Sequence, residues 1–376
     1  MFYKDKIELL RLSVKEMSRI WDDICQSTSQ TNPLIWNDAS KIFQYVMNLS
    51  AEDFELIRLH TSLIIGDFIF SYWGSYPPVD PDSFARSIGY TAITEDIPEN
   101  YHIGEPLYPK NTIPLGVNYN NKVINKNIAR YQSCISNLYY MGVLAKLKEK
   151  KDKCSIIEIG GGYGGLAHHI SQILNQKSTY ILVDIPIMLM FSGSYLMLNN
   201  PEKKVYIYNK ETFTKKFIEK DIFNYDYVLL PPYSINILES LDDVDLMINM
   251  QSFQEMSSLQ VEEYVKVGSK ILSGYLYCNN IDRHPNNESK NLDVTSIISK
   301  YFKLFPSPET YNKGLLNSTH PWFYKFYLGI PKHKNKDFLK DSRLKIRAYL
   351  PEIKKTNSKN NTLVNYPIQW KEIKNN

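Results

Sequence analysis

The chain has 376 residues, more than one hydrophobic core usually spans, so we expect more than one structural unit. A hydrophobic content of 43% and an aromatic content of 13% are ample for a globular interior. The formal net charge is +4, but residues 332–376 alone hold twelve Lys and Arg against four Asp and Glu. The rest of the chain is therefore net acidic, which argues against a nucleic-acid-binding body and leaves only a basic tail.

Cysteine spacing and apolar runs exclude two further classes of protein. The four cysteines show no C-x-x-C metal spacing, and we expect inert, reduced thiols. The apolar stretches 59–73 and 181–198 each contain an acidic residue, so neither supplies the ~20 uninterrupted apolar residues of a membrane span. The start of the chain mixes charged with apolar side chains, unlike a secretory signal. We expect a cytoplasmic protein.

The N-terminal third predicts a separate, mostly helical unit. Helices are expected over residues 7–25, 39–47 and 50–72, the last with a capping box at Ser50. The stretch that follows is irregular and rich in proline. A long irregular stretch in a compact domain is often a lid or a binding loop. We therefore assign residues 1–123 to a substrate-binding or lid unit.

A glycine-rich loop is the most informative segment. The apolar strand 156–159 breaks into Gly160–Gly165, and a helix is expected over 166–174. Glycines let the backbone turn sharply and approach a ligand closely, while unpaired N–H groups at the helix start face that ligand. A second buried strand, 180–183, ends in Asp184, nineteen residues beyond the loop, where a carboxylate is placed to hydrogen-bond a ribose. This order predicts a nucleotide-type cofactor site.

The glycines fit two cofactor patterns. Gly160, Gly162 and Gly165 satisfy G-x-G-x-x-G, the dinucleotide fingerprint. Glu158 with Gly160, Gly162 and Gly164 satisfies E-x-G-x-G-x-G, the first motif of S-adenosylmethionine-dependent methyltransferases. A glycine pattern alone also fits a tight turn that binds nothing, so the choice depends on the segments that follow.

The second half of the chain favours a methyltransferase layout. A strand over 245–249 runs into a polar loop, a helix is expected over 260–272, and the strand 274–278 leads to the polar tip Asn279–His284. Residues 320–328 are dense in aromatics and predict a closing strand. An entry helix is expected over residues 124–148, directly before the first sheet strand. This helix, the glycine loop more than 150 residues into the chain and a closing aromatic strand together form the layout of a class I methyltransferase.

The run from Glu158 through Asp184 to the 249–256 loop and the 279–283 tip resembles a bacterial family of sugar O-methyltransferases, within the class I S-adenosylmethionine-dependent superfamily. The resemblance covers roughly residues 128–330. It implies an α/β fold with a Rossmann-like sheet of six parallel strands and one antiparallel strand. It also implies S-adenosylmethionine as cofactor, and as acceptor a sugar hydroxyl of a surface glycan or of its activated precursor.

The resemblance places the methyltransferase domain at residues 124–331, between the N-terminal unit and a basic extension over 332–376. Glu158, Gly160, Gly162 and Asp184 match cofactor-binding positions of the superfamily. The full set of cofactor-binding candidates on the first strand, the glycine loop and the strand tips is Glu158, Gly160, Gly161, Gly162, Tyr163, Asp184, Asn249 and Gln251.

Methyl transfer from a sulfonium is an in-line displacement, so orienting the acceptor oxygen and removing its proton are the main tasks of the protein. A base with a pKa near the working pH is preferred, which favours histidine, or a carboxylate whose pKa is raised by burial. If the sheet follows the superfamily order, Glu255, His284 and His320 share one cleft and are the catalytic candidates. Each also has a structural explanation without catalysis: Glu255 as an acid at a helix N-terminus, His284 as a loop side chain on the surface and His320 as the first residue of a strand.

The acceptor-binding candidates lie on the long loop, the entry helix and the strand tip: Tyr76, Tyr108, Arg130, Asn279, Asn280 and Arg283. Ordinary packing explains the tyrosines, and a surface ion pair explains Arg130, without any ligand. Asp282, Glu255 and Asn279 offer oxygen ligands to a divalent metal, which stays an alternative. No clustered carboxylate motif appears, so we predict no metal site.

Two other functions stay open. An NAD-dependent oxidoreductase explains the glycines and Asp184 but not the closing aromatic strand, and a non-catalytic partner protein with a retained cofactor fold is the other alternative. The expected partner is a sugar or glycan acceptor, with no nucleic acid. The basic extension offers a peripheral contact with anionic lipid, and a homo-oligomer also stays open.

Overall fold

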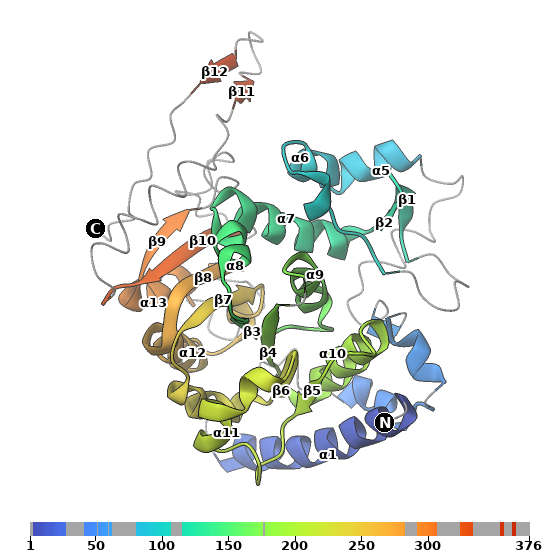
Figure 1. Cartoon of the computed structure of the whole chain (residues 1–376), viewed down its shortest axis with the longest axis vertical. Helices are drawn as coiled ribbons and strands as arrows, with labels where there is room; N and C mark the ends of the chain where they lie inside the picture. The colour runs from blue at the N-terminus through green and yellow to red at the C-terminus, as the bar shows by residue number, and fades with distance from the viewer. Residues whose placement is uncertain are drawn as a thin grey trace.

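The computed structural model describes residues 3–27, 41–50, 52–58, 60–61, 80–106, 115–175, 177–282, 292–306, 324–333, 354–356 and 363–365. Its centre is an eight-stranded sheet (Figure 1). From one edge to the other the strands are β5 (Val205–Ile207), β6 (Tyr227–Leu230), β4 (Ser178–Val183), β3 (Cys154–Ile159), β7 (Val244–Met250), β8 (Leu272–Ile281), β10 (Tyr324–Pro331) and β9 (Phe302–Pro306).

Seven strands of this sheet run in one direction, and β10 runs against both of its neighbours. The predicted Rossmann-like α/β fold and its antiparallel closing strand are thus confirmed. The sheet has one parallel strand more than the six expected, because two strands, β6 and the edge strand β5, lie beyond β4. The edge strand β5 is half-buried and has three residues, which is too few to show a periodic pattern in the sequence.

Helices cover both faces of the sheet, because right-handed crossovers run from its centre toward opposite edges. The crossover from β3 to β4 carries α9 (Gly165–Ile173), and the crossover from β7 to β8 carries α12 (Ser258–Ile271). Every side chain of β3, β4 and β6 is consequently buried. The other helices of this region are α10 (Pro186–Asn199), α11 (Lys215–Lys220), η4 (Ile222–Asn224), η5 (Pro232–Ser240), η6 (Phe253–Glu255) and α13 (Val294–Tyr301).

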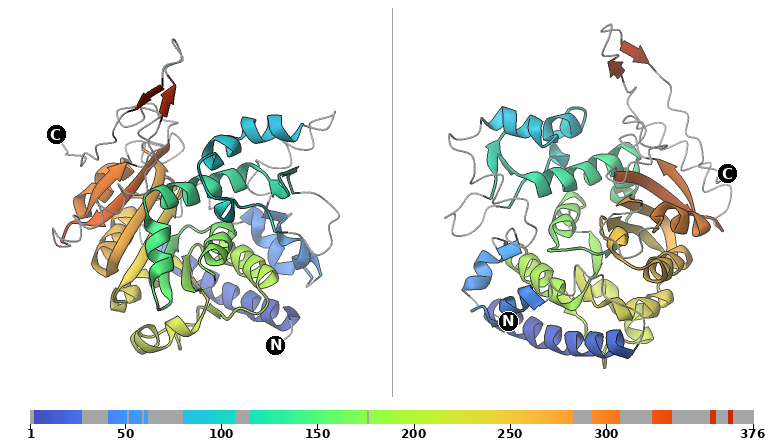
Figure 2. Two further views of the ribbon diagram at one scale, coloured as in Figure 1. Left: turned by 45° about the horizontal axis from the view of Figure 1, so that its top comes forward. Right: turned by 180° about the vertical axis from the view of Figure 1, so that it is seen from behind.

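The first helix, α1 (Tyr3–Ser27), lies along α10 (Figures 1 and 2). An added Cβ on Gly193 of α10 would lie 2.7 Å from the Leu10 side chain, so the glycine lets the two helices approach closely. Beyond α1, the predicted capping box is present. The Asp53 N–H donates to Ser50 Oγ at 3.1 Å, and the Ser50 N–H donates to Asp53 Oδ2 at 3.1 Å.

The described part of the segment before the sheet includes four α-helices, of which α7 is the longest, and a β-hairpin. They are α5 (Pro81–Ser87), α6 (Tyr90–Thr94), β1 (Val117–Tyr119), β2 (Lys122–Ile124), α7 (Lys126–Tyr140) and α8 (Val143–Glu149). Asn120 and Asn121 both have positive φ, as a two-residue hairpin turn requires. The single helix expected over 124–148 is two helices, because Gly142, with φ of 73°, breaks the chain direction between them.

In the basic extension, β11 (Lys354–Thr356) pairs with β12 (Leu363–Asn365). Within the described segments, no helix combines the length and the apolar character that crossing a membrane requires. The four cysteines are free thiols, and Cys134, Cys154 and Cys278 are buried.

The packing of α1 predicts unequal effects of two adjacent substitutions. Leu10 is fully buried against α10, so Leu10→Ala should lower the free energy of unfolding by about 2–5 kcal/mol. The neighbouring Leu9 is 46% exposed, and Leu9→Ala should change the same quantity by no more than about 0.5 kcal/mol. Urea unfolding measures both. Equal losses would show that α1 does not pack on this helical layer.

Candidate functional site

The candidate site lies at the carboxyl ends of the parallel strands, where the chain leaves β3 and β7 toward opposite edges of the sheet. Gly160, Gly162 and Gly164 have φ values of 73°, 56° and 82°, a region that favours glycine. A Cβ on Gly160 would lie 2.2 Å from the Ser252 hydroxyl oxygen, whereas a Cβ on Gly162 would meet no atom within 4 Å. The loop is therefore packed against the segment after β7 at its first glycine and open at Gly162.

Asp184, at the tip of β4, fixes the shape of the glycine loop. Its Oδ2 accepts a hydrogen bond from the Gly162 N–H at 2.8 Å, and its Oδ1 accepts one from the Ile185 N–H at 2.8 Å. Desolvation outweighs these two bonds and raises the pKa of Asp184 to about 7, and the negative charge of Glu255 adds to the rise. The residue as a whole is half-buried.

Glu158 lies beneath the loop and is 2% exposed. Its Oε2 accepts a hydrogen bond from the Tyr180 hydroxyl at 2.9 Å. Burial raises the pKa of the Glu158 carboxyl to about 8, against the effect of the Tyr180 hydrogen bond and with a further contribution from Asp184. Glu158 therefore carries a proton at neutral pH and supports the loop from below as a neutral group.

A buried amide network joins the ends of β3, β7 and β8. Asn249 Nδ2 donates to the Ile159 carbonyl at 2.9 Å and to the Ser252 hydroxyl at 2.5 Å. Asn249 Oδ1 accepts from Asn280 Nδ2 at 2.8 Å and from the Phe253 N–H at 3.2 Å. The Asn249 amide has two N–H donors and two acceptor lone pairs, and these four hydrogen bonds use all of them. Asn249 therefore ties the strand ends together.

Gln254 extends this network, and the side chain of Asn279 lies outside it. The Gln254 N–H donates to Asn280 Oδ1 at 3.2 Å, and Gln254 Oε1 accepts from the Ile281 N–H at 2.8 Å. Asn279 Oδ1 is buried and has no hydrogen-bond partner within the described part of the chain. The Asn279 carbonyl accepts from the N–H of Gln251, which has φ of 61°. A buried oxygen without a donor calls for an explanation, and a ligand hydroxyl would supply one.

The structure brings one group of the predicted site residues to this edge of the sheet: Glu158, Gly160, Gly161, Gly162, Asp184, Asn249, Gln251, Glu255, Asn279 and Asn280. Tyr163 belongs to the same loop, but its ring is fully buried and packs against the rings of Tyr131 and Tyr195. Arg130 is half-buried on α7. Five further candidates lie outside the described residues: Tyr76, Tyr108, Arg283, His284 and His320.

Sequence reasoning did not identify Tyr180, Ser252 or Gln254 as part of the site. Ser252 Oγ donates to the Ile159 carbonyl at 3.0 Å, across 93 positions of the chain. No local pattern marks such contacts, because they arise only when the ends of β3, β7 and β8 meet. Among the described residues, no three His, Cys, Asp or Glu side chains are grouped so as to hold a metal ion.

A hollow of about 840 Å³ lies away from this edge, among α5, α6 and the β1–β2 hairpin. Its lining includes Tyr90, Tyr119 and Lys122, and none of its residues belongs to the glycine loop or the strand tips. On α7, Gln132 Oε1 accepts from the Ile103 N–H on the side of the hollow at 2.8 Å, whereas the adjacent Tyr131 contacts the glycine loop.

No protein-family model matches the sequence, and no curated protein matches it. Among solved structures, the chain is similar to a TehB-like SAM-dependent methyltransferase from Corynebacterium glutamicum, with 12% identity, a TM-score of 0.32, and coverage of 54% of this chain and 97% of that chain. It is similar to the PH0226 protein from Pyrococcus horikoshii at 14% identity and a TM-score of 0.31, with coverage of 54% and 92%. It is also similar to a precorrin-6y C5,15-methyltransferase from Geobacter metallireducens, with 15% identity, a TM-score of 0.29, and coverage of 51% of this chain and 87% of that chain. At these values the similarity carries no functional assignment, which rests on the residues of this chain.

The raised pKa of Glu158 predicts a pH-dependent cost to stability. The carboxyl titrates at about 4.3 when unfolded and about 8 when folded, so the protein should lose up to about 1.4 kcal/mol of stability per pH unit between these values. Glu158→Gln keeps a neutral acceptor for Tyr180 and removes the titration. Urea unfolding at pH 5 and pH 8 measures the free energy of unfolding of both proteins. The value for Glu158→Gln minus the value for the unmodified protein should increase from pH 5 to pH 8. A difference independent of pH would contradict a protonated Glu158.

Proposed function

We propose that this chain is an S-adenosylmethionine-dependent O-methyltransferase that acts on a sugar hydroxyl of a bacterial surface glycan or of its activated precursor. The observation that carries the proposal is β10, an antiparallel strand between β8 and β9 in a sheet whose glycine loop follows its central strand β3. Dinucleotide-binding sheets are built from two parallel halves in the order 3-2-1-4-5-6, which has no place for such a strand. The strand arrangement therefore favours methyl transfer over hydride transfer.

The residues at the sheet edge fit the cofactor. The space above Gly162 admits a ligand close to the backbone, and Asp184 stands beside it. A carboxylate offers about four lone-pair sites, of which the Gly162 and Ile185 N–H groups use two. The remaining two sites would accept the two ribose hydroxyls. When bound, S-adenosylmethionine supplies an electrophilic methyl group on its sulfonium.

The protein then has to orient the acceptor hydroxyl and remove its proton. Glu255 is the candidate base among the described residues, because its effect on the pKa of Asp184 places its charge near the cofactor edge. His284 and His320 are alternative bases and stay predictions. Asn279 Oδ1, buried and without a donor among the described residues, would accept a hydrogen bond from the acceptor and so help to orient it.

The sugar class is supported by the resemblance of the 249–256 loop and the 279–283 tip to sugar O-methyltransferases. Its test is a mass-spectrometric screen of nucleotide sugars and surface glycans incubated with the protein and S-adenosylmethionine. We expect one sugar acceptor to gain the mass of a methyl group. If no sugar is modified while another class of acceptor is methylated, the substrate assignment is wrong and the reaction class holds.

Gly162 offers a direct test of the cofactor site. Gly162→Val should weaken binding of S-adenosylhomocysteine by at least about tenfold, since the side chain would enter the open space above the loop. Gly89→Val is the matched control, because Gly89 also has positive φ and nothing within 4 Å of an added Cβ, but lies before α6. Both variants bear similar backbone strain. Calorimetry that finds equal affinities in the two variants would place the cofactor elsewhere.

Glu255 tests the chemistry. With an acceptor identified by the screen, Glu255→Gln should lower turnover by about 10²–10⁴-fold, the usual contribution of a general base. The affinity for S-adenosylhomocysteine should barely change, because Glu255 is argued to face the acceptor. Wild-type turnover in this variant would exclude Glu255 as the base. If EDTA then abolishes that turnover, a metal ion activates the acceptor instead.

A further inference from the structure

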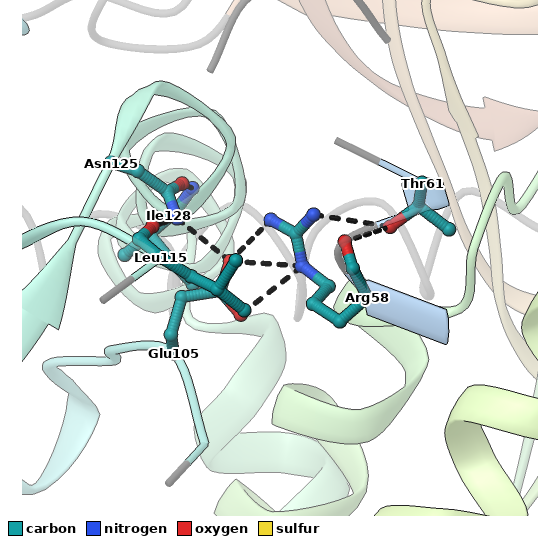
Figure 3. Close-up of polar contacts among 6 residues, drawn as sticks. All are labelled: Arg58, Thr61, Glu105, Leu115, Asn125 and Ile128. Atoms are coloured by element: carbon teal, nitrogen blue, oxygen red, sulfur yellow. Dashed lines mark hydrogen bonds and ion pairs between the residues drawn. The ribbon is translucent and has the colours of Figure 1, made fainter. Parts of the chain in front are cut away.

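A buried ion pair from the N-terminal segment lies beside the glycine loop. Arg58 has no exposed surface, and its guanidinium binds Glu105 through Nε, at 3.1 Å, and through Nη2, while Nη1 donates to Thr61 Oγ1 at 3.1 Å (Figure 3). Glu105 also accepts from Asn125 Nδ2 at 2.7 Å. Asn125 Oδ1 in turn caps α7 by accepting from the Ile128 N–H at 2.8 Å. The ion pair thus fixes Arg58 to the start of α7.

The same guanidinium covers the ring of Tyr163. Arg58 Cζ lies 4.3 Å from the ring centroid, which is cation–π contact away from water. The rings of Tyr131 and Tyr195 hold Tyr163 from other sides, with centroids 5.9 and 5.1 Å away. Between Gly160 and Gly165 only Tyr163 has a side chain beyond a hydrogen atom, so only there can a side chain of the loop itself be held by the surrounding structure.

The energetics favour a positioning role for this contact. Removing two charges from water costs about as much as their attraction gains, so a buried ion pair stabilises a fold little. The guanidinium fork is planar and rigid, however, and its orientation is set by Glu105 and Thr61. We propose that Arg58 is a positioning residue for the cofactor loop. It holds Tyr163, and thereby keeps the adjacent Gly162 N–H against Asp184. This role rests on the proposed function, because the loop it positions is the S-adenosylmethionine loop.

Hydrogen exchange followed by mass spectrometry tests the contact without any ligand. In Arg58→Met the amides of residues 160–165 should exchange at least about tenfold faster than in the unmodified protein. Without the Arg58–Tyr163 contact, less free energy is needed for the loop to open locally. Lys150→Met is the control. It breaks an ion pair with Asp245 at the opposite end of the sheet and should leave exchange in the loop unchanged. Unchanged exchange in folded Arg58→Met would overturn the proposal.

Calorimetry with S-adenosylhomocysteine tests the consequence for binding. Arg58→Met and Tyr163→Leu should each weaken binding by about tenfold. The double variant should bind little more weakly than either single variant, because both substitutions remove the same Arg58–Tyr163 contact. If Arg58→Met fails to fold, Tyr163→Leu is compared with Tyr163→Phe, which keeps the ring and should bind about tenfold more tightly. Equal affinities in that pair, or fully additive losses, would overturn the role of Arg58. Failure of the unmodified protein to bind would instead overturn the proposed function.

Discussion

The hydrogen bond from the Gly162 N–H to the Asp184 carboxylate is the constraint on which the site depends. A loop of glycines has no side chains to fix its own conformation, and three of these glycines occupy the left-handed region. Its shape therefore comes from its neighbours. Asp184 holds it from β4, Ser252 limits its first turn, and the ring of Tyr163 anchors it at the back. Gly162 alone faces open space, so the loop is fixed on every side except the one a ligand would approach.

Burial at this edge also governs the charge of the site. Glu158 and Asp184 have pKa values raised to about 8 and about 7, in both cases chiefly by desolvation, and the charge of Asp184 adds to the rise at Glu158. A neutral Glu158 below the loop leaves Asp184 as the group that ionises more easily. Ribose hydroxyls that donate to Asp184 would favour its charged form further, so the site is arranged to gain its negative charge as the ligand binds.

The sequence predicted those parts of the site whose signals are local. The glycine loop, the acid nineteen positions beyond it and the aromatic closing strand follow from spacing and residue type. The structure places the loop after β3 and the acid at the tip of β4, and it describes the closing strand over 324–331, against 320–328 in the prediction. The amide network of Asn249, Asn280 and Gln254 could not be predicted, because it forms only when distant strand ends meet. The contact of Arg58 with Tyr163 has the same origin, since it joins positions more than 100 residues apart. His284 and His320 lie outside the described residues and stay predictions.

The edge of the sheet around Gly162 and Asp184 should bind S-adenosylmethionine and not a nicotinamide dinucleotide. Equilibrium dialysis with radiolabelled S-adenosylmethionine, in the presence and absence of excess NAD, measures this directly. We expect saturable retention of S-adenosylmethionine, abolished by unlabelled S-adenosylhomocysteine and unaffected by NAD, and no retention of labelled NAD in a parallel dialysis. Retention of labelled NAD with no retention of S-adenosylmethionine would contradict this expectation.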